Sequence, residues 1–194
     1  MKINENLLKN NERELNEPFN RLWQGAVCKW AIERIHSRIL YKACGVVIGN
    51  KYFILRNNDH ARLAVNRKML AEIAILHGYI VIKIEEYTVE EQIAILASCR
   101  FLISELGSSS CNALLMPKLI GGIELTSENA TGYWSMILPS TINKWTYLRL
   151  SGKIVDSKRT IQDPNGIYRE GRDNDFYIDE KEFEQAIICM KKFE

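Results

Sequence analysis

The chain has 194 residues, of which 46% are hydrophobic and 26% are charged, and its formal net charge is +2. This length favours one domain, or one domain with a helical extension, and the composition is that of a globular protein rather than a disordered one. So small a net charge gives no argument for nucleic acid or an acidic membrane surface as the partner.

The cysteines and the first residues bear on the compartment. Five cysteines are spread through apolar contexts, without C-x-x-C or zinc-like spacing, which predicts reduced thiols. The segment 1–18 is polar and lacks the apolar core of a signal peptide, and no apolar run is long enough to span a bilayer. We therefore expect a cytoplasmic protein that is at most peripheral to a membrane.

The N-terminal part is predicted to be helical. Apolar residues in the segment 21–41 recur three and four positions apart, which is the pattern of a helix with one apolar face. We assign residues 1–45 to an N-terminal helical extension. Residues 46–194 form the second predicted domain.

The middle of the chain alternates between two periodicities. Apolar strand-like runs occupy 51–56, 79–84, 100–104 and 119–125, and helical patterns occupy 62–77, 88–98 and 111–116. Repeated alternation of strand and helix predicts a parallel sheet covered by helices, with right-handed crossovers. The fold class is thus α/β and Rossmann-like.

The C-terminal part extends this pattern. We expect a helix over 133–143, a fifth strand over 145–150 and a polar loop over 158–175. A short strand over 175–178 then leads into a closing helix over 179–192, whose acidic start and basic end suit the helix dipole.

Ligands of open α/β sheets bind beyond the carboxyl ends of the strands, which directs attention to the turn at Gly107. Backbone N–H groups at a helix start, with Ser108, Ser109 and Asn112 beside them, suit a phosphate group. The turn is neither a P-loop nor a dinucleotide fingerprint. A serine-rich helix cap without any ligand is the alternative.

Two arginines flank the loop after the first predicted strand. The guanidinium groups of Arg56 and Arg62 would clamp a diphosphate if both face the same crevice. Asn66 follows Arg62 by one helical turn and would share its face. Surface arginines and a solvated asparagine are the alternative interpretation.

Candidates for the remaining chemistry are a histidine and two glutamates. His60 and Glu105 are candidate catalytic bases, and Glu124, at the end of the fourth predicted strand, would accept two ribose hydroxyls. An uninvolved loop histidine and solvated carboxylates are the alternatives. We expect no metal at these residues.

These blocks resemble those of glycosyltransferase family 61 in their order along the chain. The carrying residues are Arg56, Arg62, Asn66, the strand 78–82 followed by Glu91-Gln92, the strand 101–104, Gly107-Ser108, the block 112–117, the strand 123–125 and Tyr133-Trp134. The resemblance spans roughly residues 51–150. Leu106 stands where the family often has histidine, so no role of that histidine carries over.

The resemblance implies a fold and an activity. It implies one half of a GT-B-like architecture, the half that binds the donor, with acceptor binding left to an N-terminal domain or a partner chain. It also implies inverting transfer of a sugar from a nucleotide donor, often UDP-linked, to a saccharide of capsule or surface polysaccharide. No cofactor other than this donor substrate is expected.

Two other functions stay open on the residues alone. The chain could be a non-catalytic or degenerate nucleotide-sugar-binding module that acts with a partner chain. It could also be an unrelated Rossmann-like oxidoreductase, although the missing glycine fingerprint argues against that.

Overall fold

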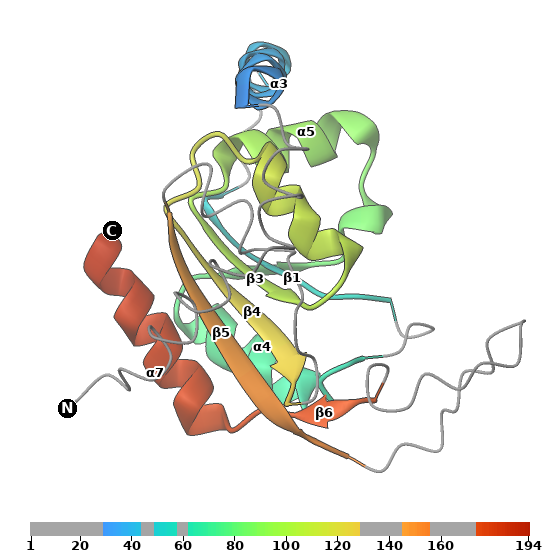
Figure 1. Ribbon diagram of the computed structural model, residues 1–194, viewed down its shortest axis with the longest axis vertical. Coiled ribbons are helices and arrows are strands. Elements are labelled where there is room, and N and C mark those ends of the chain that lie inside the picture. Colours follow the sequence, from blue (N-terminus) through green and yellow to red (C-terminus); the bar gives the residue numbers. More distant parts are fainter. Residues whose placement is uncertain (1–28, 44–48, 58–61, 129–144, 156–173) are drawn as a thin grey trace, which may run out of the picture.

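The computed structural model describes residues 29–43, 49–57, 62–128, 145–155 and 174–194 (Figure 1). Within them lies one six-stranded sheet, in the order β2-β1-β3-β4-β5-β6. The strands are β1 (Lys51–Ile54), β2 (Ile80–Ile82), β3 (Phe101–Glu105), β4 (Gly121–Ser127), β5 (Thr146–Ile154) and β6 (Phe176–Tyr177). The first five are parallel and β6 is antiparallel to β5, so the predicted α/β Rossmann-like fold is confirmed.

Helices cover both faces of the sheet. They are α3 (Lys29–Lys42), α4 (Arg67–Leu76), α5 (Val89–Ser98), α7 (Glu180–Met190) and the 3₁₀ helices η1 (Ile84–Glu86), η2 (Ser108–Leu115) and η3 (Lys191–Phe193). The α4 and α7 helices lie together against one face, and α5 and η2 lie against the other (Figure 1). The α3 helix packs outside α5 and η2 as a further layer.

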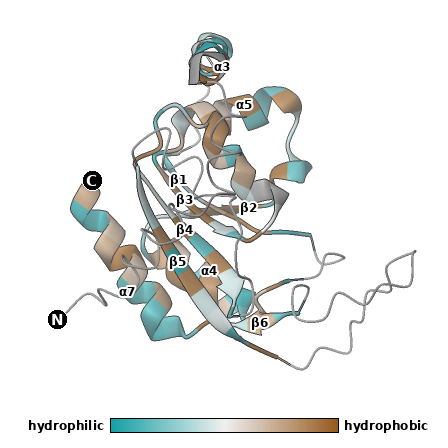
Figure 2. Ribbon diagram, in the orientation of Figure 1, coloured by the Kyte–Doolittle hydropathy of each residue, from teal (hydrophilic) through white to brown (hydrophobic). Residues whose placement is uncertain are grey.

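Two hydrophobic cores follow from the alternation of side chains along the strands. Successive strand residues point to opposite faces, so Phe53 joins the core under α4 and α7 while Tyr52 joins the core under α5. Both side chains are fully buried, as expected where helices cover both faces of a parallel sheet. In Figure 2, α7 carries brown and teal segments along its length, which is the pattern of a helix with one apolar face.

Two predicted helix starts are confirmed. Thr88 and Glu91 form a reciprocal capping box at the start of α5. Asp179 caps α7, where its carboxylate accepts the N–H groups of Lys181 and Glu182, each at 3.0 Å.

Some predicted boundaries are wrong for tertiary reasons. The α4 helix begins at Arg67 rather than at 62, because Arg62 has a left-handed backbone (φ 65°) and Ala64 bridges to Phe176 of β6. The predicted helix 111–116 is a 3₁₀ helix that already begins at Ser108. The predictions for 1–28, 133–143 and most of 158–175 lie outside the described residues.

Candidate functional site

The strand order places the site. From β1 the chain moves to β2 on one side and then crosses to β3 on the other side of β1. The β1–β2 and β2–β3 connections therefore run in opposite directions across the sheet. In open α/β sheets such a switch point opens a crevice at the carboxyl ends of the two strands. The residues that follow β1 and end β3 are therefore the first candidates for binding a ligand.

Arg56, two residues beyond β1, is buried and held at both ends. Its N–H donates to Oε2 of Glu105 at 3.0 Å, and its Nη1 donates to the carbonyl of Leu106 at 2.9 Å. Its guanidinium lies over Gly107, where an added Cβ would come within 3.0 Å of the arginine Cζ. The backbone of Gly107 is extended, so it is this close approach, and not the backbone angle, that favours a glycine.

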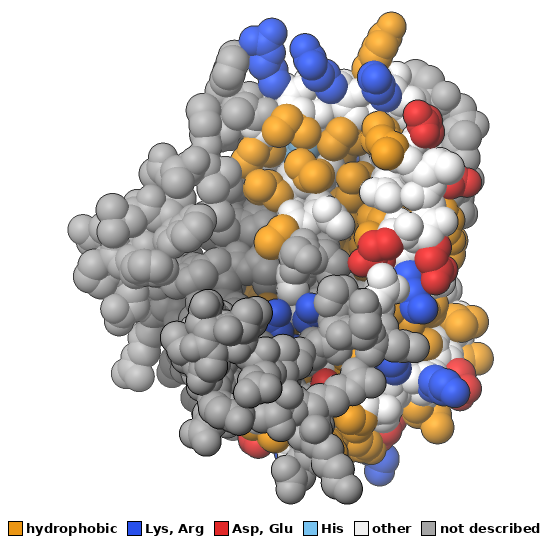
Figure 3. Space-filling model, turned by 90° about the vertical axis from the view of Figure 1, so that its right-hand side faces the viewer, with side chains coloured by type: hydrophobic (Ala, Val, Ile, Leu, Met, Phe, Trp, Pro, Cys, Tyr) orange, Lys and Arg blue, Asp and Glu red, His pale blue; other side chains and the backbone are white. Residues whose placement is uncertain are grey.

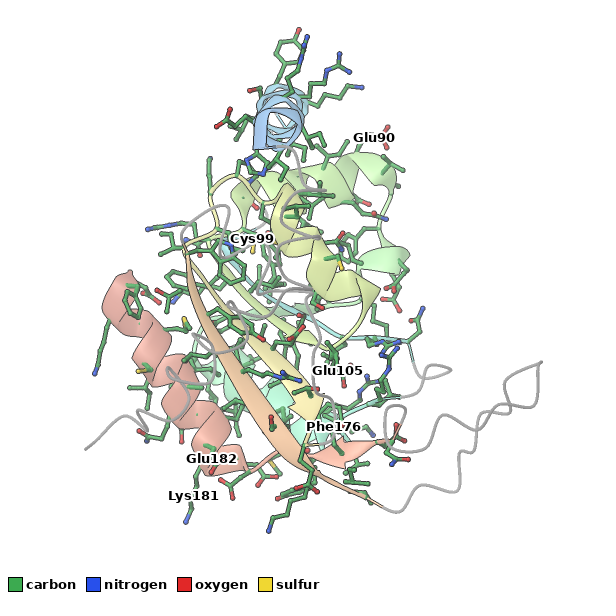
Figure 4. All side chains as sticks on the ribbon, viewed as in Figure 1. Glu90, Cys99, Glu105, Phe176, Lys181 and Glu182 are labelled. Carbon is green, nitrogen blue, oxygen red and sulfur yellow. The ribbon has the colours of Figure 1, made fainter. Side chains whose placement is uncertain are left out.

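Glu105, the last residue of β3, has no exposed surface and anchors the loop that follows β1 (Figure 4). Its Oε2 accepts the Arg56 N–H, and its Oε1 accepts the Ala64 N–H at 2.9 Å. Arg67, at the start of α4, forms an ion pair with the same carboxylate. One side chain therefore joins the beginning of the loop, its end and the following helix.

This geometry bears on the base predicted at Glu105. A general base must come within hydrogen-bonding distance of the acceptor hydroxyl, but both carboxylate oxygens already accept N–H groups inside the protein. The contacts favour a positioning role, and the role of base stays a prediction. His60, the other candidate base, lies outside the described residues.

Arg67 is a site residue that the sequence analysis did not select. Its side chain is 14% exposed. Arg67 and Arg56 contact the same carboxylate, that of Glu105. Its place at the first position of the helix after β1 was the available indication. Three arginines, with Arg62, thus border the β1–α4 connection.

Arg62 is strained, and this gives a test. A left-handed backbone costs a non-glycine residue roughly 1–2 kcal/mol, which glycine avoids at a loss of roughly 0.5–1 kcal/mol in chain entropy. We expect Arg62→Gly to be about 0.5–1 kcal/mol more stable in urea unfolding than Arg62→Ala. Both variants should bind nucleotide equally weakly. Equal stability of the two would show that φ at this position relaxes at no cost.

Asn66 is placed differently from the prediction. It is the N-cap of α4 rather than a residue on a shared helix face with Arg62. Its Nδ2 donates to the Ile178 carbonyl at 2.8 Å and to Oε1 of Glu180 at 2.7 Å. The side chain joins α4 to the start of α7, and its role in donor binding stays a prediction.

The turn at Gly107 is closed by Ser110. The Ser110 hydroxyl donates to the Gly107 carbonyl at 2.6 Å and accepts the Gly107 N–H at 3.3 Å, and the Ser110 side chain is buried. Asn112 is half-buried in η2. The side chains of Ser108 and Ser109 are not among those that the structure describes. The Ser110 side chain therefore caps the turn. Phosphate binding by the turn stays a prediction.

Glu124 lies inside β4, which continues to Ser127, so the prediction that it closes the strand is wrong. It is fully buried and accepts the Tyr147 hydroxyl at 2.8 Å. In the sheet register its cross-strand neighbours are Ser104 and Arg149. Sequence reasoning missed Tyr147, although its place in an alternating strand put it on this face.

Cys111 of η2 lies near this carboxylate. Partial burial of its thiol raises the pKa of Cys111, and the negative charge of Glu124 raises it further. The thiol is therefore kept protonated and is a poor nucleophile. The ribose-binding role expected for Glu124 stays a prediction.

Among the described residues, no three His, Cys, Asp or Glu side chains gather as they would around a metal ion. None of the described helices combines the length and apolar composition needed to span a bilayer.

Comparison with known proteins assigns the family. The model of the family described as glycosyltransferase 61 matches residues 10–121, which is more than half of the chain. No curated protein matches the chain significantly. The matched residues include Arg56, Glu105 and Gly107 and end at the first residue of β4, before Glu124. The chain therefore belongs to glycosyltransferase family 61.

Proposed function

We propose that the chain binds a nucleotide-sugar donor, UDP-linked, at the carboxyl ends of β1 and β3 and transfers its sugar to a saccharide in surface polysaccharide biosynthesis. The observation that carries this proposal is the buried Arg56, fixed over Gly107 by bonds to Glu105 and Leu106. A buried arginine held in one orientation at a switch point suits a ligand with fixed anionic groups.

The arginines supply the main catalytic contribution in this scheme. When the bond from the sugar to the diphosphate breaks, negative charge grows on the departing oxygen. Cationic donors that are already oriented stabilise this charge without reorganising at the moment of reaction. Arg56 would hold the diphosphate with Arg62, and the ion pair between Arg67 and Glu105 would keep the surrounding loop in place.

Inversion needs a base near the acceptor hydroxyl, and this group stays to be found. His60 is the candidate outside the described residues, and an N-terminal domain or a partner chain is the other source. In this proposal the chain is the donor half of a GT-B-like enzyme, works in the cytoplasm beside the membrane, and needs no metal or further cofactor.

Isothermal titration calorimetry tests the donor site. Purified chain is titrated with UDP, other nucleoside diphosphates and their sugar conjugates, beside an Arg56→Ala/Arg62→Ala variant. We expect micromolar binding of one nucleotide class and a loss of at least about 100-fold in the variant, since each charged hydrogen bond contributes about 1.5–3 kcal/mol.

The matched control is Arg100→Ala/Lys118→Ala, which removes two cations just before the amino ends of β3 and β4. It should bind as the wild type does. If the folded wild type binds no nucleotide, the donor site is refuted. Retained donor binding without transfer to any acceptor would instead identify the non-catalytic module that acts with a partner.

A further inference from the structure

The outer side of α3 carries a row of cationic side chains that the proposed donor site does not use. Arg34, Arg38 and Lys42 are all exposed, and they follow one another at intervals of four residues, which places them along one stripe of the helix. Glu33 is the only acidic residue in α3. Three positive charges thus share one face of this helix, in a chain whose formal net charge is only +2.

Apolar side chains accompany this cationic stripe. Tyr41 is 81% exposed and lies seven residues after Arg34, so it projects from the same stripe. Ile35 and Leu40, exposed by 41% and 42%, lie on its two sides. Packing against the described residues does not explain a tyrosine so exposed between cationic residues.

The orientation of α3 is fixed by its other side. Ile32 and Ile39 are buried, and the His36 side chain contacts the Leu114 carbonyl of η2 through Nε2 at 2.8 Å. The helix therefore cannot turn its cationic stripe inward without losing these contacts. Figure 3 shows Lys and Arg side chains projecting at the top of the molecule, where α3 lies, above a surface on which hydrophobic side chains gather.

We propose that this face of α3 docks on an anionic phospholipid surface. Arg34, Arg38 and Lys42 contact the phosphate-bearing headgroups, while Tyr41 and its apolar neighbours enter the boundary between headgroups and acyl chains. Cationic residues beside an aromatic ring and aliphatic flanks are what a helix lying in a membrane interface needs. Nucleic acid would use the charges but leave the aliphatic flanks in water.

Charge around the stripe is consistent with this partner. The adjoining layer carries two exposed acidic residues, Glu90 and Glu91, at the start of α5. In Figure 4, Glu90 lies at the start of α5, below α3, so it does not interrupt the stripe on the outer side. The proposal adds a specific surface to the peripheral location proposed above, and it does not require the donor site.

Co-sedimentation with vesicles tests the surface. One set of vesicles is phosphatidylcholine alone, and the other is equal parts of phosphatidylcholine and phosphatidylglycerol. We expect binding to the anionic vesicles only, and weaker binding as salt is added. Arg38→Gln/Lys42→Gln should lower the partition coefficient by about 30-fold, because each charge near an anionic surface contributes about 5-fold.

Two further variants test whether vesicle binding depends on this face of α3 and on its aromatic ring. Lys181→Gln/Lys191→Gln, which removes two exposed cations on the C-terminal helices, should bind the vesicles as the wild type does. Tyr41→Ser should weaken binding even at high salt, because it removes the aromatic ring rather than a charge. Circular dichroism checks that each variant is folded, as expected for changes on an exposed face.

Several outcomes would overturn the proposal. Absence of wild-type binding to anionic vesicles, or an equal loss in the control variant, removes the membrane contact. A dimer in sedimentation velocity that Tyr41→Ser dissociates would make a second copy of the chain the occupant instead. Because no nucleotide is present, these outcomes are independent of whether the chain binds a donor.

Discussion

Glu105→Gln should destabilise the protein by about 3 kcal/mol and remove nucleotide binding with it. The amide presents an NH₂ group to N–H donors that now meet a carboxylate, and it removes the negative charge with which the Arg67 guanidinium pairs at this position. Urea unfolding measures the first effect and calorimetry the second. Exchange of the Arg56 and Ala64 amide protons should also become faster, since both now donate to Glu105.

The same variant separates a positioning role from that of a base. A base that is replaced by an amide loses turnover but keeps its stability and its affinity for the donor. A positioning residue loses all three. Glu72→Gln, on the exposed side of α4, is the matched control and should change stability by less than about 0.5 kcal/mol.

The coupling between Glu105 and Arg67 can be measured directly. If the two act as one ion pair, the double variant Glu105→Gln/Arg67→Met should cost clearly less than the sum of the single variants. Additive losses would mean that Glu105 acts only through the two backbone N–H groups. Unchanged stability in Glu105→Gln would contradict the anchoring role altogether.

Gly107→Ala should weaken nucleotide binding by about 10- to 100-fold while costing about 1 kcal/mol of stability or less. The new methyl group would lie 3.0 to 3.2 Å from three atoms of the Arg56 guanidinium, which must move away. The neighbour that moves is the end of a flexible side chain, so the fold tolerates the change. Calorimetric titration and urea unfolding measure the two effects.

Gly107→Ala made in an Arg56→Ala protein shows whether Arg56 transmits the loss of nucleotide binding. In Arg56→Ala the guanidinium is absent, so Gly107→Ala should then cause no further loss of binding. An equal loss in both backgrounds would mean that alanine alters the turn at Ser110 instead.

The fold class was predictable from the sequence because its signals are local. Apolar runs and helical spacing depend on neighbouring residues, and they indicated each strand from β1 to β5 and the helices α4 and α5. The caps at Thr88 and Asp179 were predictable for the same reason, since each cap bonds N–H groups within three residues.

The candidate site was predictable in its location and less so in its contacts. Arg56, Glu105 and Gly107 were selected because they follow strands that end in a polar turn, and the structure brings all three together. The contacts of Glu105 differ from those of the solvated carboxylate considered as the alternative, because a strand-end carboxylate in a sequence does not show whether water or the protein surrounds it. Here Glu105 is fully buried.

Only the tertiary structure decided the contacts between residues that are distant in the sequence. Glu105 meets the Arg56 N–H across 49 positions, and Asn66 meets Ile178 across 112, because β3 pairs with β1 and β6 returns beside Ala64. Strand order and register come from the packing of the whole chain, and local periodicity does not contain them. The sequence by itself determined an α/β sheet with arginines near its carboxyl edge, and the packing of that sheet decided that a buried carboxylate organises them.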